Sequence, residues 1–152
     1  MTVDSSALIA VLFAEPGYLD LVDRILAADQ ARIGAPTLVE TSLVFVGRRR
    51  TPGAAEVEEL VKELAITVVP FGEAEWRVAV DAFARFGRGR HRAALNFGDC
   101  LSYASAVVAG DSLLYAGDDF SHTDIAPASG RSEWPARAGG RARASAHRAS
   151  SR

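Results

Sequence analysis

Cysteine and histidine are scarce in this chain. One cysteine, Cys100, excludes an intrachain disulfide. The three histidines lack the spacing of zinc ligands, and the chain has no second cysteine to complete a zinc site. We therefore expect Cys100 to be a small buried core residue, and the sequence argues against the disulfide-rich and zinc-bound classes of small domain.

Long apolar runs and a basic N-terminal segment are also missing. The longest apolar run near the start, Ala7–Ala14, has eight residues, whereas a membrane helix needs roughly 20. Asp4 comes before any lysine or arginine, unlike the start of a signal peptide. These absences predict a soluble cytoplasmic protein with no membrane partner.

Basic residues are outnumbered by acidic residues outside the C-terminal end. Residues 129–152 hold six arginines and one glutamate, which leaves 11 basic and 18 acidic residues for the rest of the chain. The end is rich in Ala, Arg, Gly and Ser, with almost nothing to bury, so we expect a disordered basic tail behind a folded domain at 1–128. The tail either adds non-specific attraction to RNA or has no part in the chemistry.

Helix and strand patterns alternate along the folded part. Apolar spacing and turn residues predict strands over 1–3, 31–35, 66–69 and 112–116, and helices over 5–13, 18–28, 36–48, 52–64, 73–86 and 95–108. Such alternation predicts an α/β fold with a short, mostly parallel sheet covered on both faces.

Acidic residues recur where strands end or helices begin. Asp4 follows the first strand, Glu40 is expected in the first turn of the third helix, Asp99 opens the helix over 95–108, and Asp118 and Asp119 follow the last strand. The carboxyl ends of parallel strands share one sheet edge, so these acids can converge. Their repulsion is relieved by protonation or by a divalent cation, and oxygen ligands without histidine or cysteine favour Mg²⁺, with Mn²⁺ as a substitute.

Asp99 and Ser6 each have an alternative, purely structural interpretation. Asp99 in a first helical turn gains roughly 0.3–1 kcal/mol from the helix dipole, so a capping role stays open. Ser6 either orients Asp4 or a metal-bound water, or it caps its helix.

A basic loop precedes the helix that carries Asp99. The loop lacks the Gly-Lys-Ser/Thr ending of a nucleotide-binding P-loop. Its charge suits a polyanion backbone approaching an acidic centre, or simply an exposed loop kept soluble. The candidate RNA-binding residues are Arg88, Arg90, His91 and Arg92.

Two other classes of acidic phosphoryl-transfer enzyme fit less well. A haloacid-dehalogenase-type phosphatase needs a second aspartate where Ser6 stands. A response-regulator receiver needs a lysine late in the fold, and the chain's one lysine is Lys62. Hydrolysis of a phosphodiester by a metal-activated water is the better hypothesis.

Four motifs taken together resemble the PIN-domain ribonucleases, and most closely the VapC toxins of bacterial toxin–antitoxin systems. They are Asp4-Ser5-Ser6-Ala7-Leu8, Glu40 within 38–42, the run from Gly87 to Cys100, and 113–120, and the resemblance covers about residues 1–128. It implies a three-layer α/β/α domain, Mg²⁺-dependent endoribonuclease activity, a homodimer and neutralisation by a VapB-type antitoxin.

The resemblance also implies roles for individual residues. Asp4 and Asp99 match the principal metal ligands, and Glu40 supports the ion directly or through water. Many relatives carry an aspartate where this chain has Gly117. The role of the fourth acid therefore passes to Asp119, with Asp118 as its substitute.

A non-catalytic alternative remains. A PIN-like interaction module would use the same acids to bind a partner protein, with a docking groove on the helices over 5–28 and 52–64. Metal-dependent RNA cleavage separates the two hypotheses.

Overall fold

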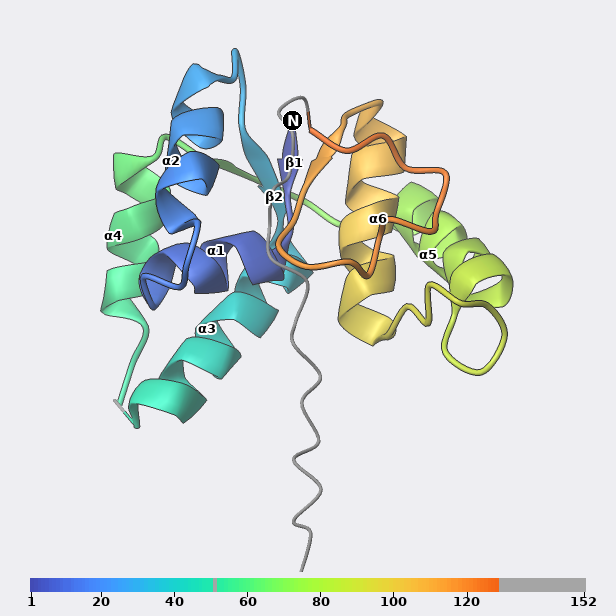
Figure 1. Ribbon diagram of the computed structural model, residues 1–152, viewed down its shortest axis with the longest axis horizontal. Coiled ribbons are helices and arrows are strands. Elements are labelled where there is room, and N and C mark those ends of the chain that lie inside the picture. Colours follow the sequence, from blue (N-terminus) through green and yellow to red (C-terminus); the bar gives the residue numbers. More distant parts are fainter. Residues whose placement is uncertain (51, 129–152) are drawn as a thin grey trace, which may run out of the picture.

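The computed structural model describes residues 1–50 and 52–128, so the predicted tail at 129–152 lies outside the described residues (Figure 1). Four short strands alternate with six helices over this part of the chain. The elements are β1 (Thr2–Val3), α1 (Ser5–Leu12), α2 (Tyr18–Ala27), β2 (Arg32–Gly34), α3 (Ala35–Arg49), α4 (Ala55–Glu63), β3 (Thr67–Val69), α5 (Glu73–Phe86), α6 (Phe97–Ala109) and β4 (Leu113–Leu114).

The four strands form one sheet in the order β3-β2-β1-β4. Every pairing between them is parallel, with Thr2 opposite both Arg32 and Leu113. The predicted parallel α/β sheet is therefore confirmed. All four carboxyl ends point to the same edge of the sheet, below the N-terminus in Figure 1.

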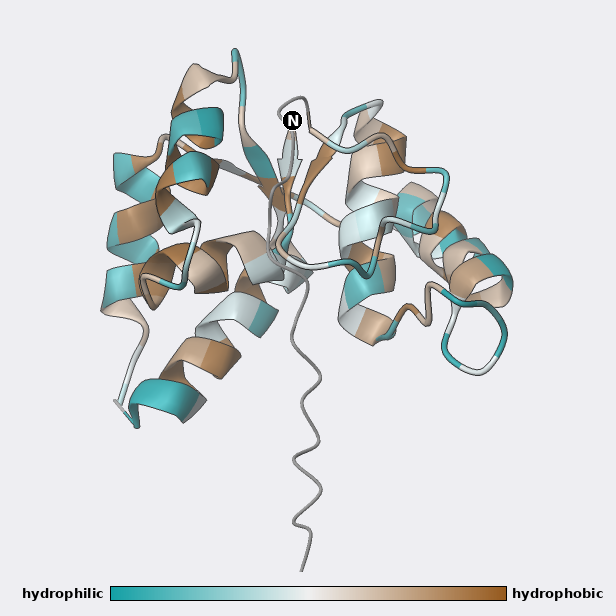
Figure 2. Cartoon of the chain, viewed as in Figure 1, coloured by the Kyte–Doolittle hydropathy of each residue, from teal (hydrophilic) through white to brown (hydrophobic). Residues whose placement is uncertain are grey.

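Helices cover both faces of this sheet. One hydrophobic core joins the strands to α1, α2 and α4, and includes Leu8, Ile25 and Val61. A second core joins them to α5 and α6, and includes Phe86 and Cys100. Cys100 is buried, as predicted. Figure 2 shows apolar residues on the strands and on the adjoining helices, with hydrophilic residues on outer sides of α2, α4 and α5. The result is the predicted three-layer α/β/α architecture.

Helix α3 lies across the carboxyl edge of the sheet. It contacts α1 in one layer and α6 in the other (Figure 1). The helix begins at Ala35, because Gly34 takes an extended N-cap conformation and Pro36 is tolerated in the first turn. Glu40 therefore lies in the second turn, and its predicted place in the first turn is wrong.

Other boundaries shift by a few residues. Helix α4 begins at Ala55 rather than at 52. Helix α6 begins at Phe97, because Leu95 pairs with Gly87 in a bridge that closes the basic loop. Among the described helices, none combines the length and apolarity that crossing a bilayer requires.

Candidate active site

Asp4 stands at the junction of β1 and α1. It is the N-cap of α1, and its Oδ2 accepts hydrogen bonds from the Ser6 backbone N–H at 2.9 Å and from the Ser6 hydroxyl at 2.5 Å. Only 2% of Asp4 is exposed. The carboxylate that caps the helix is thus held in one orientation at the sheet edge.

Ser6 ties this carboxylate to the neighbouring strand. Its Oγ accepts a hydrogen bond from the Ala116 N–H at 3.0 Å, two residues past β4. The Asp4 N–H donates to the Leu114 carbonyl at 2.9 Å. Asp4, rather than Ser6, caps the helix, and the Ser6 hydroxyl bridges Asp4 to the segment after β4.

Glu40 faces the same space from α3. Burial raises the pKa of its carboxyl, the negative charge of Asp4 raises it further, and a hydrogen bond from the Ser5 side chain opposes them. The motif Asp4-Ser5-Ser6 therefore supplies one acid and two hydroxyl groups, with the Ser6 hydroxyl bound to Asp4 and the Ser5 hydroxyl to Glu40. The role of Ser5 was not predicted from the sequence.

Gly98 leaves the room that the Glu40 carboxylate occupies. A Cβ added at Gly98 would lie 2.4 Å from both Glu40 carboxylate oxygens, well inside van der Waals contact. The sequence suggested only that Gly98 starts a helix. A single glycine in a loop-to-helix run gives no signal of which side chain will pack against it.

Replacing Gly98 therefore tests the geometry of the site separately from the stability of the fold. Alanine favours a helix over glycine by up to about 1 kcal/mol, so we expect Gly98→Ala to stay folded. The displaced Glu40 carboxylate should lower the RNA cleavage that the family resemblance implies by about tenfold or more, since a misplacement of about 1 Å can cost a hundredfold. Gly47→Ala is the matched control, because nothing lies within 4 Å of that added Cβ. Equal activity of the two variants, measured with equal melting temperatures, would contradict the role of Gly98.

Asp99 lies in the first turn of α6, where its side chain takes part in the helix cap and interacts electrostatically with the other acids. Its Oδ2 accepts a hydrogen bond from the Asn96 N–H at 2.7 Å, and Asn96 Oδ1 accepts one from the Asp99 N–H at 3.0 Å. Burial raises the pKa of Asp99 to about 6 against the lowering effect of the Asn96 hydrogen bond, and the charges of Asp4, Asp119 and Glu40 add to the rise. The capping box uses one carboxylate oxygen and leaves the second for other partners.

The two aspartates after β4 differ in their surroundings. Asp119 raises the pKa of Asp99 through its charge. Asp118 acts instead on Tyr115, whose pKa is raised by burial and by the charge of Asp118. Gly117 has a φ of +96°, a left-handed conformation that turns the chain here. The structure thus brings Asp119 toward Asp99, whereas Asp118 lies nearer Tyr115.

Two carboxylate oxygens at this edge are buried without a hydrogen-bond partner among the described residues, Asp4 Oδ1 and Glu40 Oε2. A buried carboxylate oxygen without a partner is costly, and a cation is one group that satisfies it. Within residues 1–50 and 52–128, no three His, Cys, Asp or Glu side chains already stand close enough to hold one ion. Like charges repel, so carboxylates facing a common space stand further apart than those bridged by a cation.

The raised pKa of Asp99 makes stability depend on pH. Its pKa rises from 3.8 to about 6 on folding, so the folded state holds more protons than the unfolded state between about pH 4 and about pH 6. This group's contribution to stability therefore falls as pH rises through that window. In EDTA, we expect the melting temperature of Asp99→Asn relative to wild type to rise from about pH 4 to about pH 7. A constant difference across that range would show that folding does not raise the pKa of Asp99.

The basic loop lies just before α6. Arg88, Arg90 and Arg92 are exposed. His91 is half-buried, with its ring edge-on to Phe86 at 5.3 Å between centroids and its Nδ1 accepting the Ala93 N–H at 3.2 Å. The three arginines are thus accessible to a polyanion, although Arg90 also lies over the Phe83 ring, and His91 packs on the last residue of α5.

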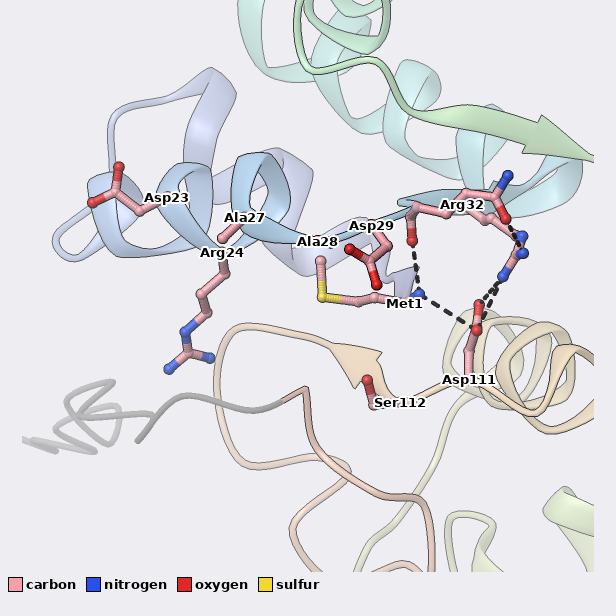
Figure 3. Close-up of a pocket in the computed structure, with 10 residues that line it drawn as sticks. Met1, Asp23, Arg24, Ala27, Ala28, Asp29, Arg32, Asp111 and Ser112 are labelled. Atoms are coloured by element: carbon pink, nitrogen blue, oxygen red, sulfur yellow. Dashed lines mark hydrogen bonds and ion pairs between the residues drawn. The ribbon is translucent and has the colours of Figure 1, made fainter.

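The opposite end of the sheet carries a cavity of about 760 Å³ (Figure 3). Asp111 there accepts hydrogen bonds from Arg32 at 2.8 Å and from the Thr2 hydroxyl at 3.0 Å, and its carboxylate lies 3.4 Å from the Met1 amino group. Burial alone would raise the pKa of Asp111, but the hydrogen bonds from Arg32 and Thr2 lower it. The charged residues that line this cavity compensate one another. None of the acids at the carboxyl edge of the sheet lines it.

Comparison with known proteins places this geometry in a family. A family model described as the PIN domain matches residues 1–126. Ribonuclease VapC30 of Mycobacterium tuberculosis is 39% identical over 127 residues, which cover 83% of this chain and 96% of that protein. The chain belongs to the VapC family of PIN-domain ribonucleases. Ribonuclease VapC42 of the same species is 40% identical over 129 residues, covering 84% of this chain and 98% of that VapC protein.

Two solved structures share the fold. M. tuberculosis VapC20, described as a Sarcin-Ricin loop cleaving toxin, aligns with a TM-score of 0.65 over 82% of this chain and 95% of its own, at 15% identity. A toxin–antitoxin complex from Klebsiella pneumoniae aligns with a TM-score of 0.59 over 81% and 92%, also at 15% identity. The predicted fold class, the VapC family and the class of enzyme, a ribonuclease, are confirmed.

Proposed function

We propose that this VapC-family chain is a Mg²⁺-dependent endoribonuclease toxin that hydrolyses RNA at the carboxyl edge of its sheet. The observation that carries the proposal is the pair of buried, unpartnered carboxylate oxygens, Asp4 Oδ1 and Glu40 Oε2, beside an Asp99 coupled to both residues. An all-oxygen donor set suits Mg²⁺, with Mn²⁺ as a substitute.

Each acid has a distinct role in this proposal. Asp4 and Asp99 are the principal metal ligands, Glu40 supports the ion directly or through water, and Asp119 is the fourth acid. Ser6 holds Asp4 in place through its 2.5 Å hydrogen bond. When bound, Mg²⁺ supplies Lewis-acid stabilisation of the phosphodiester and a water of lowered pKa.

The exposed loop arginines bind the RNA. The part of the chain before residue 129 holds 18 acidic and 11 basic residues. Its net negative charge repels the phosphate backbone of RNA. Arg88, Arg90 and Arg92 lie on the loop that leads directly into α6 and offset that repulsion beside the acids. His91 contributes by shaping the loop.

The direct test is RNA cleavage by purified chain freed of any antitoxin. We expect structured RNA to be cut with Mg²⁺ or Mn²⁺, and EDTA to stop the reaction. An interaction module would leave RNA whole and would bind its partner equally well with or without Mg²⁺. RNA that stays intact at saturating Mg²⁺ would exclude the nuclease.

The proposed partner is a cognate VapB-type antitoxin, and the proposed place of action is the cytoplasm, where RNA is available. Expression of the chain should arrest growth, and co-expression of a short neighbouring gene should relieve the arrest. Growth arrest by Asp99→Asn as strong as by wild type would argue against RNA cleavage as its cause.

The proposed homodimer uses an apolar face formed by α3, α5 and the start of α6. Two adjoining cavities of about 660 and 500 Å³ run along it and share Phe71, Trp76, Phe97 and Leu101. The exposed side chains of this face are Val39, Leu43, Trp76, Val80, Phe83 and Phe97. Its three aromatic rings alone expose roughly 300–400 Å², since an aromatic side chain covers about 150–250 Å².

The largest apolar patch on a monomer is typically about 300–600 Å² and often functional, and a standard interface covers about 800 Å² per partner. With its aliphatic residues added to the aromatic rings, this face suits an interaction site. A second copy is the occupant that suits it, because a continuous apolar ridge and groove can complement itself about a two-fold axis.

Leu43→Glu should therefore convert the dimer to a monomer, as measured by light scattering after size exclusion. Leu19→Glu on α2 is the matched control, because Leu19 is 62% exposed and Leu43 is 68% exposed. Dissociation by the Leu19 variant alone would place the interface on the other layer. A wild-type chain that is monomeric at micromolar concentration would exclude the dimer.

A further inference from the structure

Helices α3 and α6 meet along a seam of small residues that ends at the acids. The seam has three levels, spaced about one helical turn apart along α6. From the inner level to the level nearest the site, the facing pairs are Gly34 with Ser105, Thr37 with Ser102, and Glu40 with Gly98.

The middle level is a buried hydroxyl pair. Thr37 Oγ1 and Ser102 Oγ lie 3.2 Å apart, and either hydroxyl can donate. Both side chains are fully buried. This hydrogen bond crosses from one of these helices to the other.

The outer levels show how close the helices are. A Cβ added at Gly34 would lie 2.5 Å from the Ser105 Oγ, and one at Gly98 would strike the Glu40 carboxylate. At both ends of the seam a residue larger than glycine would displace the side chain that it faces, Ser105 or Glu40.

Thr37 and Ser102 each stand one turn from a candidate metal ligand. Thr37 precedes Glu40 by three residues on α3, and Ser102 follows Asp99 by three residues on α6. Residues three apart lie on the same side of a helix, so a shift at this pair moves both acids. An apolar pair would hold the helices together as well, but a buried hydrogen bond also fixes their separation and rotation.

We propose that Thr37 and Ser102 are positioning residues that set how far Glu40 stands from Asp99. This inference rests on the proposed function, because it concerns the same metal site. The pair touches neither the RNA nor the ion. It acts through the two helices that carry the acids.

The test measures Mn²⁺ affinity by titration on the full-length chain, together with the melting temperature. Thr37→Val removes one hydroxyl at nearly constant volume, and Ser102→Ala removes the other. We expect each to weaken Mn²⁺ binding by about tenfold, the low end of the 10–100-fold cost of losing an outer-shell partner. The double variant should bind no more weakly than the singles, since the two residues act as one unit. Thr37→Ser keeps the hydroxyl and should bind Mn²⁺ within about twofold of wild type.

Two neighbouring hydroxyls on α3 give matched controls. The Thr41 hydroxyl donates to the Thr37 carbonyl and the Ser42 hydroxyl to the Leu38 carbonyl, both within the same helix. Thr41→Val and Ser42→Ala should lower the melting temperature without changing Mn²⁺ affinity.

Wild-type affinity in both Thr37→Val and Ser102→Ala, with only a lowered melting temperature, would overturn the positioning role. If the valine variant fails to fold, Ser102→Ala and Thr37→Ser decide the matter between them. A wild-type chain that binds no Mn²⁺ would overturn the metal site itself and this inference with it, an outcome distinct from unchanged affinity in the variants.

Discussion

Asp99→Asn should lower RNA cleavage by about a hundredfold to a thousandfold while the folded chain stays intact. A metal ion contributes several kcal/mol of transition-state stabilisation, and each 1.36 kcal/mol is a factor of ten in rate. Asparagine keeps the shape and can still accept the capping hydrogen bond from Asn96. It removes a charge that is buried among Asp4, Glu40 and Asp119, so the melting temperature above about pH 6 should hold or rise.

The combination of lost activity and retained stability is the informative result. Asp29→Asn, at the amino end of the sheet beside the 760 Å³ cavity, is the control and should leave cleavage unchanged. Full activity in Asp99→Asn would remove the proposed mechanism. Lost activity together with a large fall in melting temperature would reduce Asp99 to a helix cap.

The second large effect separates two adjacent residues. Asp119→Asn should lower cleavage by about a hundredfold, whereas Asp118→Asn should change it by less than about threefold. Both side chains are exposed and both substitutions remove one charge, so general electrostatics and folding are matched. The difference follows from the structure, in which Asp119 acts on Asp99 and Asp118 acts on Tyr115.

Cleavage rates at several Mg²⁺ concentrations check this pair. If Asp119 supports the ion, its variant should need more Mg²⁺ for half-maximal rate. A loss confined to the Asp118 variant would exchange the two roles, and no loss in either would leave a three-acid site.

The sequence predicted the large features because they follow from periodic patterns. Strand and helix alternation predicted a parallel sheet, and parallel strands place their carboxyl ends together whatever the side chains are. That rule brought Asp4 and the Asp118–Asp119 pair into one hypothesis although they are far apart in the chain, and Asp99 joined them as an acid at the start of a helix. The structure adds that Glu40 and Asp119 are electrostatically coupled to Asp99.

The features that the sequence did not predict depend on packing between elements. Nothing in the run around Gly98 shows that the Glu40 carboxylate fills the space beside it. The Thr37–Ser102 contact joins residues 65 positions apart, and each looks like an ordinary helix residue. His91 seemed one more basic group of the loop, but its ring packs on Phe86. Periodicity predicts which side of an element is buried, and does not specify which side chain it meets there.

If the distant acids share one divalent cation, Mn²⁺ soaked into crystals of the chain should bind among them. We expect an anomalous peak at the carboxyl edge of the sheet, within coordination distance of Asp4 and Asp99, with Glu40 bound directly or through a water. An anomalous peak only at the cavity beside Asp111, or no peak at concentrations that support cleavage, would contradict this expectation.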